Sequence, residues 1–134
     1  MTALSVARQD LAACEVVDYA LFSGGLVGAT YQTVVDAYNT SLTRSTPTAL
    51  SVGRAYLAAA SVGDYALFGG GIVGSTQQNT VDAYNTSLTR STPTALSVSR
   101  SLLGAATIGI YALFGGGRTG STTSSSVVNV YECS

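Results

Sequence analysis

Histidine, lysine and tryptophan are absent from the sequence, and only 10% of its 134 residues are charged. Six arginines against seven acids give a net charge of −1, so the basic face that nucleic-acid binding requires is missing. Without histidine, and with only two cysteines, the sequence has no set of zinc ligands. The acids stand singly and form no catalytic pair. We therefore expect no enzymatic activity, no metal or cofactor, and no nucleic-acid partner.

We also expect no targeting or membrane segment. The first residues run directly into repeated sequence, without the basic and apolar regions of a signal peptide. The most apolar stretch, 102–117, is about 16 residues long and contains five glycines, whereas a membrane helix needs roughly 20 apolar residues. We expect two buried strands there and no membrane partner, and the localisation stays open. Cys14 and Cys133 are not equivalent positions, and two separate thiols or one disulfide both fit the sequence.

What the sequence does contain is one repeat in three copies, at 3–48, 49–94 and 95–134, which we interpret as a single domain over 1–134. The first two copies share 34 of 46 residues, and the segment 36–48 recurs unchanged at 82–94. The third copy gains one residue in a loop rich in serine and threonine. Identity this high indicates recent amplification or deliberate construction.

Each copy divides into four short segments with the character of β-strands. In the second copy these are 57–62, 65–68, 80–84 and 92–98. Glycine-rich turns and a polar loop at 74–79 separate them. Four strands in 46 residues are typical of a β-propeller blade, so we expect an all-β fold of four-stranded antiparallel blades, three in each chain.

The repeat resembles the kelch repeat. Arg54, Tyr65, the pair Gly70-Gly71 and Tyr84 stand where that family has its arginine, first aromatic, double glycine and tyrosine, although Leu88 replaces the usual tryptophan. The resemblance covers nearly the whole chain and implies a propeller with a central channel. By this resemblance, the arginine before the first strand and the residue after the double glycine lie at the mouth of the channel, where peptides bind in that family. The residues concerned are Arg8, Arg54, Arg100 and Arg118, and Tyr56 adds a stacking face beside Arg54. A peptide- or glycan-binding propeller is the alternative function. The alternative is that the arginines bind backbone carbonyls between the blades.

The ends of the chain fall inside a blade. Residues 2–6 correspond to a fourth strand, and the third copy stops before its own fourth strand. Because propellers have 4–8 blades, we expect two copies to form a six-bladed homodimer, with residues 2–6 completing the last blade. A nine-bladed homotrimer and a fragment of a longer propeller are the alternatives. The residues assigned to closure are Thr2, Ala3, Leu4, Ser5, Val6, Val128, Val130 and Tyr131. The function we expect is that of a self-assembling, non-catalytic scaffold or interaction module.

Overall fold

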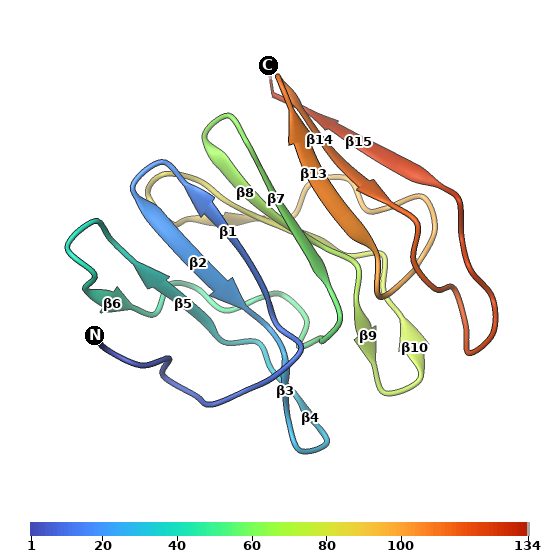
Figure 1. Cartoon of the computed structure of the whole chain (residues 1–134), viewed down its shortest axis with the longest axis horizontal. Coiled ribbons are helices and arrows are strands. Elements are labelled where there is room, and N and C mark those ends of the chain that lie inside the picture. The colour runs from blue at the N-terminus through green and yellow to red at the C-terminus, as the bar shows by residue number, and fades with distance from the viewer. Residues whose placement is uncertain (134) are drawn as a thin grey trace.

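The computed structural model describes residues 1–133, which form antiparallel β-sheets (Figure 1). Within this range no helix is long and apolar enough to cross a membrane. Sheet 1 contains β1 (Ala12–Val16), β2 (Tyr19–Ser23), β5 (Val35–Tyr38) and β6 (Arg44–Ser45). Sheet 2 contains β7 (Ala58–Val62), β8 (Tyr65–Gly69), β11 (Val81–Tyr84) and β12 (Arg90–Ser91). Sheet 3 contains β13 (Gly104–Ile108), β14 (Tyr111–Gly115) and β15 (Val128–Glu132).

The all-β prediction is confirmed, as are the first three strands of the repeat. In sheet 2, β7, β8 and β11 differ from the predicted segments by at most one residue at each end. The second strand ends at the double glycine because the segment that leads into the next sheet approaches its backbone. Gly70 has a φ of 72°, and a Cβ atom there would lie 2.7 Å from the carbonyl oxygen of Arg100. Only glycine meets both conditions without strain.

The predicted fourth strand at 92–98 is wrong. The strand that pairs with β11 is the two-residue β12, and the chain after it leaves the sheet. Pro93 has no N–H to continue the pairing. The N–H of Leu96 donates instead to the carbonyl of Asn79, at 2.8 Å, and its side chain is buried between sheets 2 and 3. Because this leucine is buried there, the segment forms part of the connection to sheet 3 and not a strand of sheet 2.

Two short hairpins extend from the loops of the first two repeats. They are β3–β4 (Leu26–Val27 and Thr30–Tyr31) and β9–β10 (Ile72–Val73 and Thr76–Gln77). The predicted polar loop at 74–79 therefore contains β10. In the third repeat a single isolated bridge, from Arg118 to Ser124, stands in place of this hairpin.

Each sheet has two different faces. The aromatic face has a phenylalanine from the second strand and a tyrosine from the third, and their rings meet edge to face with centroids 5.9, 6.0 and 5.7 Å apart in sheets 1, 2 and 3. The aliphatic face has leucine, valine and alanine. The aromatic residues are Phe22 and Tyr38, Phe68 and Tyr84, and Phe114 and Tyr131.

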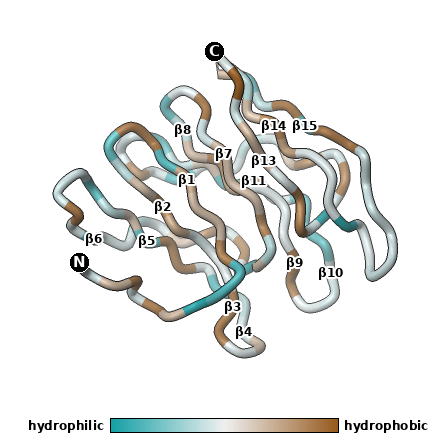
Figure 2. The backbone as a smooth tube through the Cα atoms, viewed as in Figure 1, coloured by the Kyte–Doolittle hydropathy of each residue, from teal (hydrophilic) through white to brown (hydrophobic). Residues whose placement is uncertain are grey.

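The sheets pack aromatic face against aliphatic face. The aromatic face of sheet 2 covers the aliphatic face of sheet 1, and the aromatic face of sheet 3 covers the aliphatic face of sheet 2. β7 lies beside both β1 and β13, and Figure 2 shows hydrophobic stretches on these strands. Hydroxyl groups reinforce both junctions, because Ser61 donates to the carbonyl of Glu15 and Thr107 donates to the carbonyl of Ser61. Both junctions are therefore of the same type, with an aromatic face packed on an aliphatic face.

The segment before each sheet lies across that sheet. Tyr38 donates from its hydroxyl to the carbonyl of Thr2, at 2.9 Å, and Arg44 donates to the carbonyl of Ala3, at 2.7 Å. Tyr84 and Arg90 make the same contacts with residues 48 and 49. In the single chain, residues 2–6 form no strand, and the carbonyls of Thr2 and Ala3 accept hydrogen bonds from side chains of sheet 1. Strand exchange with a second copy stays a prediction.

Candidate functional site: two uncovered sheet faces

The repeated arginines are structural clamps. Arg54 is fully buried and donates to the carbonyls of Gly70, Thr80 and Phe68 at 2.5, 2.9 and 3.2 Å. It also forms an ion pair with Asp82 at 2.7 Å. Burial lowers the pKa of Arg54, and the Asp82 carboxylate acts in the opposite direction. A guanidinium that binds three carbonyls and a carboxylate ties the connecting segment to its sheet.

The other two repeats contain the same clamp with one difference. Arg8 pairs with Asp36 at 2.9 Å, and both side chains are fully buried. Burial opposes ionisation of Asp36, but hydrogen bonds from Ser5 and Arg8 outweigh it and lower its pKa. Arg100 meets Asn129 in place of a carboxylate, and burial lowers the pKa of Arg100. The third clamp therefore holds a buried cation without an ion pair.

These contacts favour the internal role for Arg8, Arg54 and Arg100 over the expected ligand-binding role. Their side chains are buried and point at carbonyls within the chain, which agrees with the alternative that the sequence left open. Arg118 is exposed and donates to the carbonyls of Gly120 and Ser121, in its own loop. None of the four arginines presents a free guanidinium beside the others.

Tyr56 does lie at an exposed meeting point of the repeats. Its N–H donates to the carbonyl of Asp10 at 3.0 Å, and its own carbonyl accepts from Leu102 at 2.9 Å. All three residues have positive φ, between 55° and 58°, although none is glycine. A side-chain hydrogen bond with Asp10 raises the pKa of Tyr56. These equivalent positions form a line before β1, β7 and β13, and sequence reasoning found only Tyr56 among them.

The aliphatic face of sheet 3 is uncovered in the described chain. Ile108 is 67% exposed, whereas its equivalent in sheet 2, Val62, is 5% exposed. Val128 is 56% exposed, whereas its equivalent Val81 is 1% exposed. A shallow hollow of about 280 Å³ lies on this face. Apolar side chains that are buried at one junction are thus open to solvent at the end of the stack.

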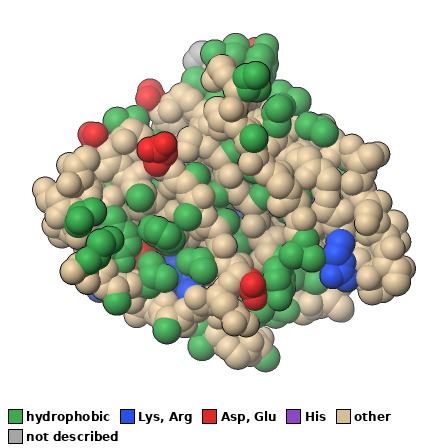
Figure 3. Space-filling model, viewed as in Figure 1, with side chains coloured by type: hydrophobic (Ala, Val, Ile, Leu, Met, Phe, Trp, Pro, Cys, Tyr) green, Lys and Arg blue, Asp and Glu red, His purple; other side chains and the backbone are tan. Residues whose placement is uncertain are grey.

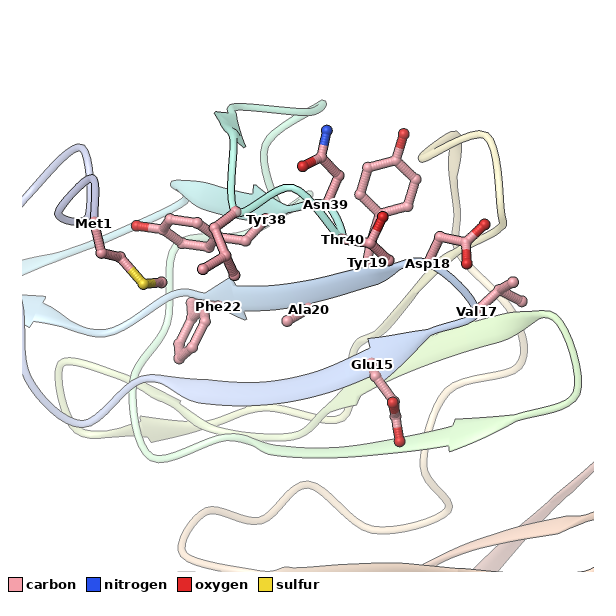
Figure 4. A pocket seen from close by; sticks show the side chains of 11 residues that line it. Met1, Glu15, Val17, Asp18, Tyr19, Ala20, Phe22, Tyr38, Asn39 and Thr40 are labelled. Atoms are coloured by element: carbon pink, nitrogen blue, oxygen red, sulfur yellow. The ribbon is translucent and has the colours of Figure 1, made fainter.

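The aromatic face of sheet 1 is the second uncovered face. Ala20 is exposed, whereas its equivalents Ala66 and Ala112 are completely buried. A hollow of about 310 Å³ lies here, and Figure 4 shows Met1, Phe22, Tyr38 and other side chains around it. Figure 3 shows hydrophobic side chains over the region that β2 and β5 occupy in Figure 1, and more near the C-terminus.

The residues assigned to closure fall into two groups. Thr2, Ala3 and Ser5 contribute backbone groups to hydrogen bonds on sheet 1, and Leu4 and Val6 are half-buried in the same segment. Val128 and Val130 lie on the uncovered face of sheet 3, whereas Tyr131 packs on the opposite face against sheet 2. The structure therefore separates residues 2–6 from the three residues of β15. Sequence reasoning found part of one face and missed Ile108 and Ala20.

Among residues 1–133, no three histidine, cysteine, aspartate or glutamate side chains are grouped so as to hold a metal ion. Both cysteines are free, and burial raises the pKa of Cys14 to about 12. No family model matches the chain, and no curated protein matches it. The arrangement is suited to apolar association of sheets.

Proposed function

We propose that the chain is a self-assembling half of a β-propeller, in which the three sheets are blades and two copies close a six-bladed ring. The observation that supports this is that the two uncovered faces are complementary. One is aromatic and the other aliphatic, and this combination already packs at both junctions inside the chain. A second copy therefore offers each face the surface that it meets elsewhere.

The composition of the uncovered faces supports the same proposal. Large contiguous apolar patches on a soluble protein mark interaction surfaces. In a two-fold ring, sheet 3 of each copy packs on sheet 1 of the other, so both patches of both chains are covered. The ring also leaves the clamps intact, because each clamp lies within a single repeat. Its role is that of a non-catalytic scaffold, and the resemblance to kelch repeats agrees with it.

Strand exchange is not needed for this closure. In the proposed ring, residues 2–6 stay on sheet 1 of their own chain, where four residues of the sheet and its clamp hold them. The two copies contact each other through the faces of sheets 1 and 3. The sequence-based expectation was closure by exchange of residues 2–6. Closure through sheet faces depends instead on the side chains of the two uncovered faces.

Size-exclusion chromatography with light scattering tests the proposal directly. At micromolar concentration the expected mass is twice the 13.6 kDa of one chain. A mass three times that of the chain would support a nine-bladed trimer instead. A single-chain mass across the accessible concentration range would refute self-assembly.

A substitution on the aliphatic face of sheet 3 tests which surface is used. Burial of an isoleucine side chain contributes about 1.5–3 kcal/mol, and a two-fold ring contains Ile108 twice. Ile108→Asp should therefore raise the dissociation constant by at least about 100-fold, since each 1.4 kcal/mol corresponds to tenfold. Val27→Asp, in the exposed hairpin β3–β4, is the matched control and should leave the mass unchanged. Equal masses for the two variants would exclude this face.

A further inference from the structure

A groove of about 340 Å³ lies between sheets 2 and 3, beside the outer edge of β15. β15 pairs with β14 on one side, and no other described strand pairs with its second side. The groove therefore combines an apolar surface with unpaired backbone groups, which together favour an added strand. Its lining residues in sheet 2 are Val62, Tyr65, Leu67, Ala83, Ser91 and Pro93, and those in sheet 3 are Tyr131, Glu132 and Cys133.

The corresponding place between sheets 1 and 2 is occupied by a leucine. Leu88 follows β11 and packs against the cluster that contains Val16, Leu21 and Ala37. These three residues are the repeat equivalents of Val62, Leu67 and Ala83 in the groove. The chain itself thus shows which side chain this kind of groove accepts.

The strand after that leucine has a fixed register. In sheet 2, Arg90 pairs with Tyr84 and Ser91 pairs with Ala83. Sheet 1 has the same register with an identical sequence, since residues 42–48 and 88–94 both read Leu-Thr-Arg-Ser-Thr-Pro-Thr. The equivalent partners on β15 are Tyr131 and Val130.

The polar groups that hold this strand are also present at sheet 3. Arg90 donates to the carbonyl of Ala49 at 2.6 Å, and the equivalent acceptor at sheet 3 is the carbonyl of Ala95. The segment that carries Ala95 is held on β15, because Tyr131 donates to the carbonyl of Thr94 at 2.6 Å. Glu132 is the only charged residue in the lining of the groove and stands where sheets 1 and 2 have asparagine. Its carboxylate favours a cationic ligand.

We propose that the outer edge of β15 binds a separate, extended peptide in which a leucine precedes an arginine by two residues. The leucine fills the groove, and the following residues pair with β15 as a fourth strand of sheet 3. A second copy of the chain is not the source, because its own strands of this sequence, β6 and β12, already pair with β5 and β11. The site lies within one chain, so it goes beyond the proposed function and does not require the ring.

The test uses the full chain and a fluorescent decapeptide with the sequence of residues 85–94. Fluorescence anisotropy should show saturable binding. A peptide with aspartate in place of the leucine should bind at least about tenfold more weakly, because a charge would enter the apolar groove. Glu132→Lys in the protein should also weaken binding at least about tenfold, whereas Asp18→Lys, on the far side of sheet 1, should not.

Alkylation of the two thiols provides a second measurement. Cys133 lines the groove, so bound peptide should slow its reaction with iodoacetamide at least about fivefold. Cys14 is outside the groove, and its rate should not change. Equal binding of the leucine and aspartate peptides, or binding without protection of Cys133, would overturn the proposal. Light scattering of the same samples gives the mass, so a monomer that binds the peptide would refute the ring and retain the site.

Discussion

Asn129→Asp is expected to stabilise the protein, because it restores an ion pair that the first two repeats contain. Arg54 and Asp82 lie 2.7 Å apart with no exposed side-chain surface. At the same position in sheet 3, Arg100 is equally buried but donates to the amide oxygen of Asn129. The substitution changes a neutral acceptor into a charged one and alters the shape of the side chain little.

The magnitude follows from two opposing effects. The bond from Arg100 to the Asn129 amide already has one charged partner, so a carboxylate adds the attraction between two opposite charges, about 4 kcal/mol at about 4 Å for an effective dielectric constant of about 20. The new carboxylate must lose water, which opposes this gain. The Asn129 amide nitrogen now donates to the Ser97 hydroxyl at 3.1 Å, and in the variant that hydroxyl would donate to the carboxylate, as Ser51 donates to Asp82. We expect a net gain of about 1–2 kcal/mol. Asp82→Asn should cost about 2–4 kcal/mol, because it leaves Arg54 without its ion pair.

Urea denaturation followed by circular dichroism measures both variants. A gain of 1–2 kcal/mol moves the midpoint upward by roughly 0.5–1 M, for a slope of about 2 kcal/mol per molar. The measurement is made at one chain concentration, because assembly also contributes to stability. An unchanged or lower midpoint for Asn129→Asp, together with a clear loss for Asp82→Asn, would refute the view that the third clamp lacks a charge.

Three further predictions concern closure, pH and backbone. Glu15→Ser should lower the dissociation constant of the dimer about tenfold in light-scattering titrations, because Ser61 and Thr107, at the same position of the repeat, each donate to a carbonyl of the first strand in the neighbouring sheet. Weaker association would contradict this. The pKa of Asp36 is lowered in the folded state, so its stabilisation is complete above about pH 4 and is lost as the pH falls through the folded value. The urea midpoints of the wild type and Asp36→Asn should therefore converge below about pH 4, and a constant difference would be contrary evidence. Gly70→Ala should lower the free energy of unfolding by at least about 2 kcal/mol, and Gly74→Ala by about 1 kcal/mol. Both glycines have positive φ, but of the two only Gly70 has a backbone atom within 3 Å of the added Cβ. Equal losses of stability would argue against the close approach at Gly70.

The sequence predicted the strands that are fixed by local chemistry. β7, β8 and β11 follow from short apolar segments between Gly63, Gly70-Gly71 and Asn85, whose turn preferences act over a few residues. The fourth strand was misplaced because 92–98 has the composition of a strand, but Leu96 is buried between sheets 2 and 3 and the segment leaves the edge of sheet 2. Tertiary contact outweighs local preference there, and no local pattern indicates it.

The candidate site was predicted only in part for a similar reason. Arginines in register suggest either a ligand site or an internal clamp, and the choice depends on burial, which the sequence does not state. Ala20 and Ile108 are ordinary apolar residues until their neighbours are known. Ala20 and Ala66 occupy the same position of the repeat, but only Ala66 has a sheet packed over it. Exposure here depends on a residue's place in the stack.

Sheet 2 is the only sheet of the described chain that has a neighbour on both faces, and this has a consequence for cooperativity. In a stack in which each unit contacts only its neighbours, stability is a sum of unit and junction terms. Identical residues in β5 and β11, such as Asp36 and Asp82, then experience different opening free energies. Amide hydrogens of β11 should exchange with solvent more slowly than those of β5 in the single chain. Packing both end sheets against another copy would remove that difference. Comparing the exchange rates of β5 and β11 therefore reports whether sheets 1 and 3 are covered.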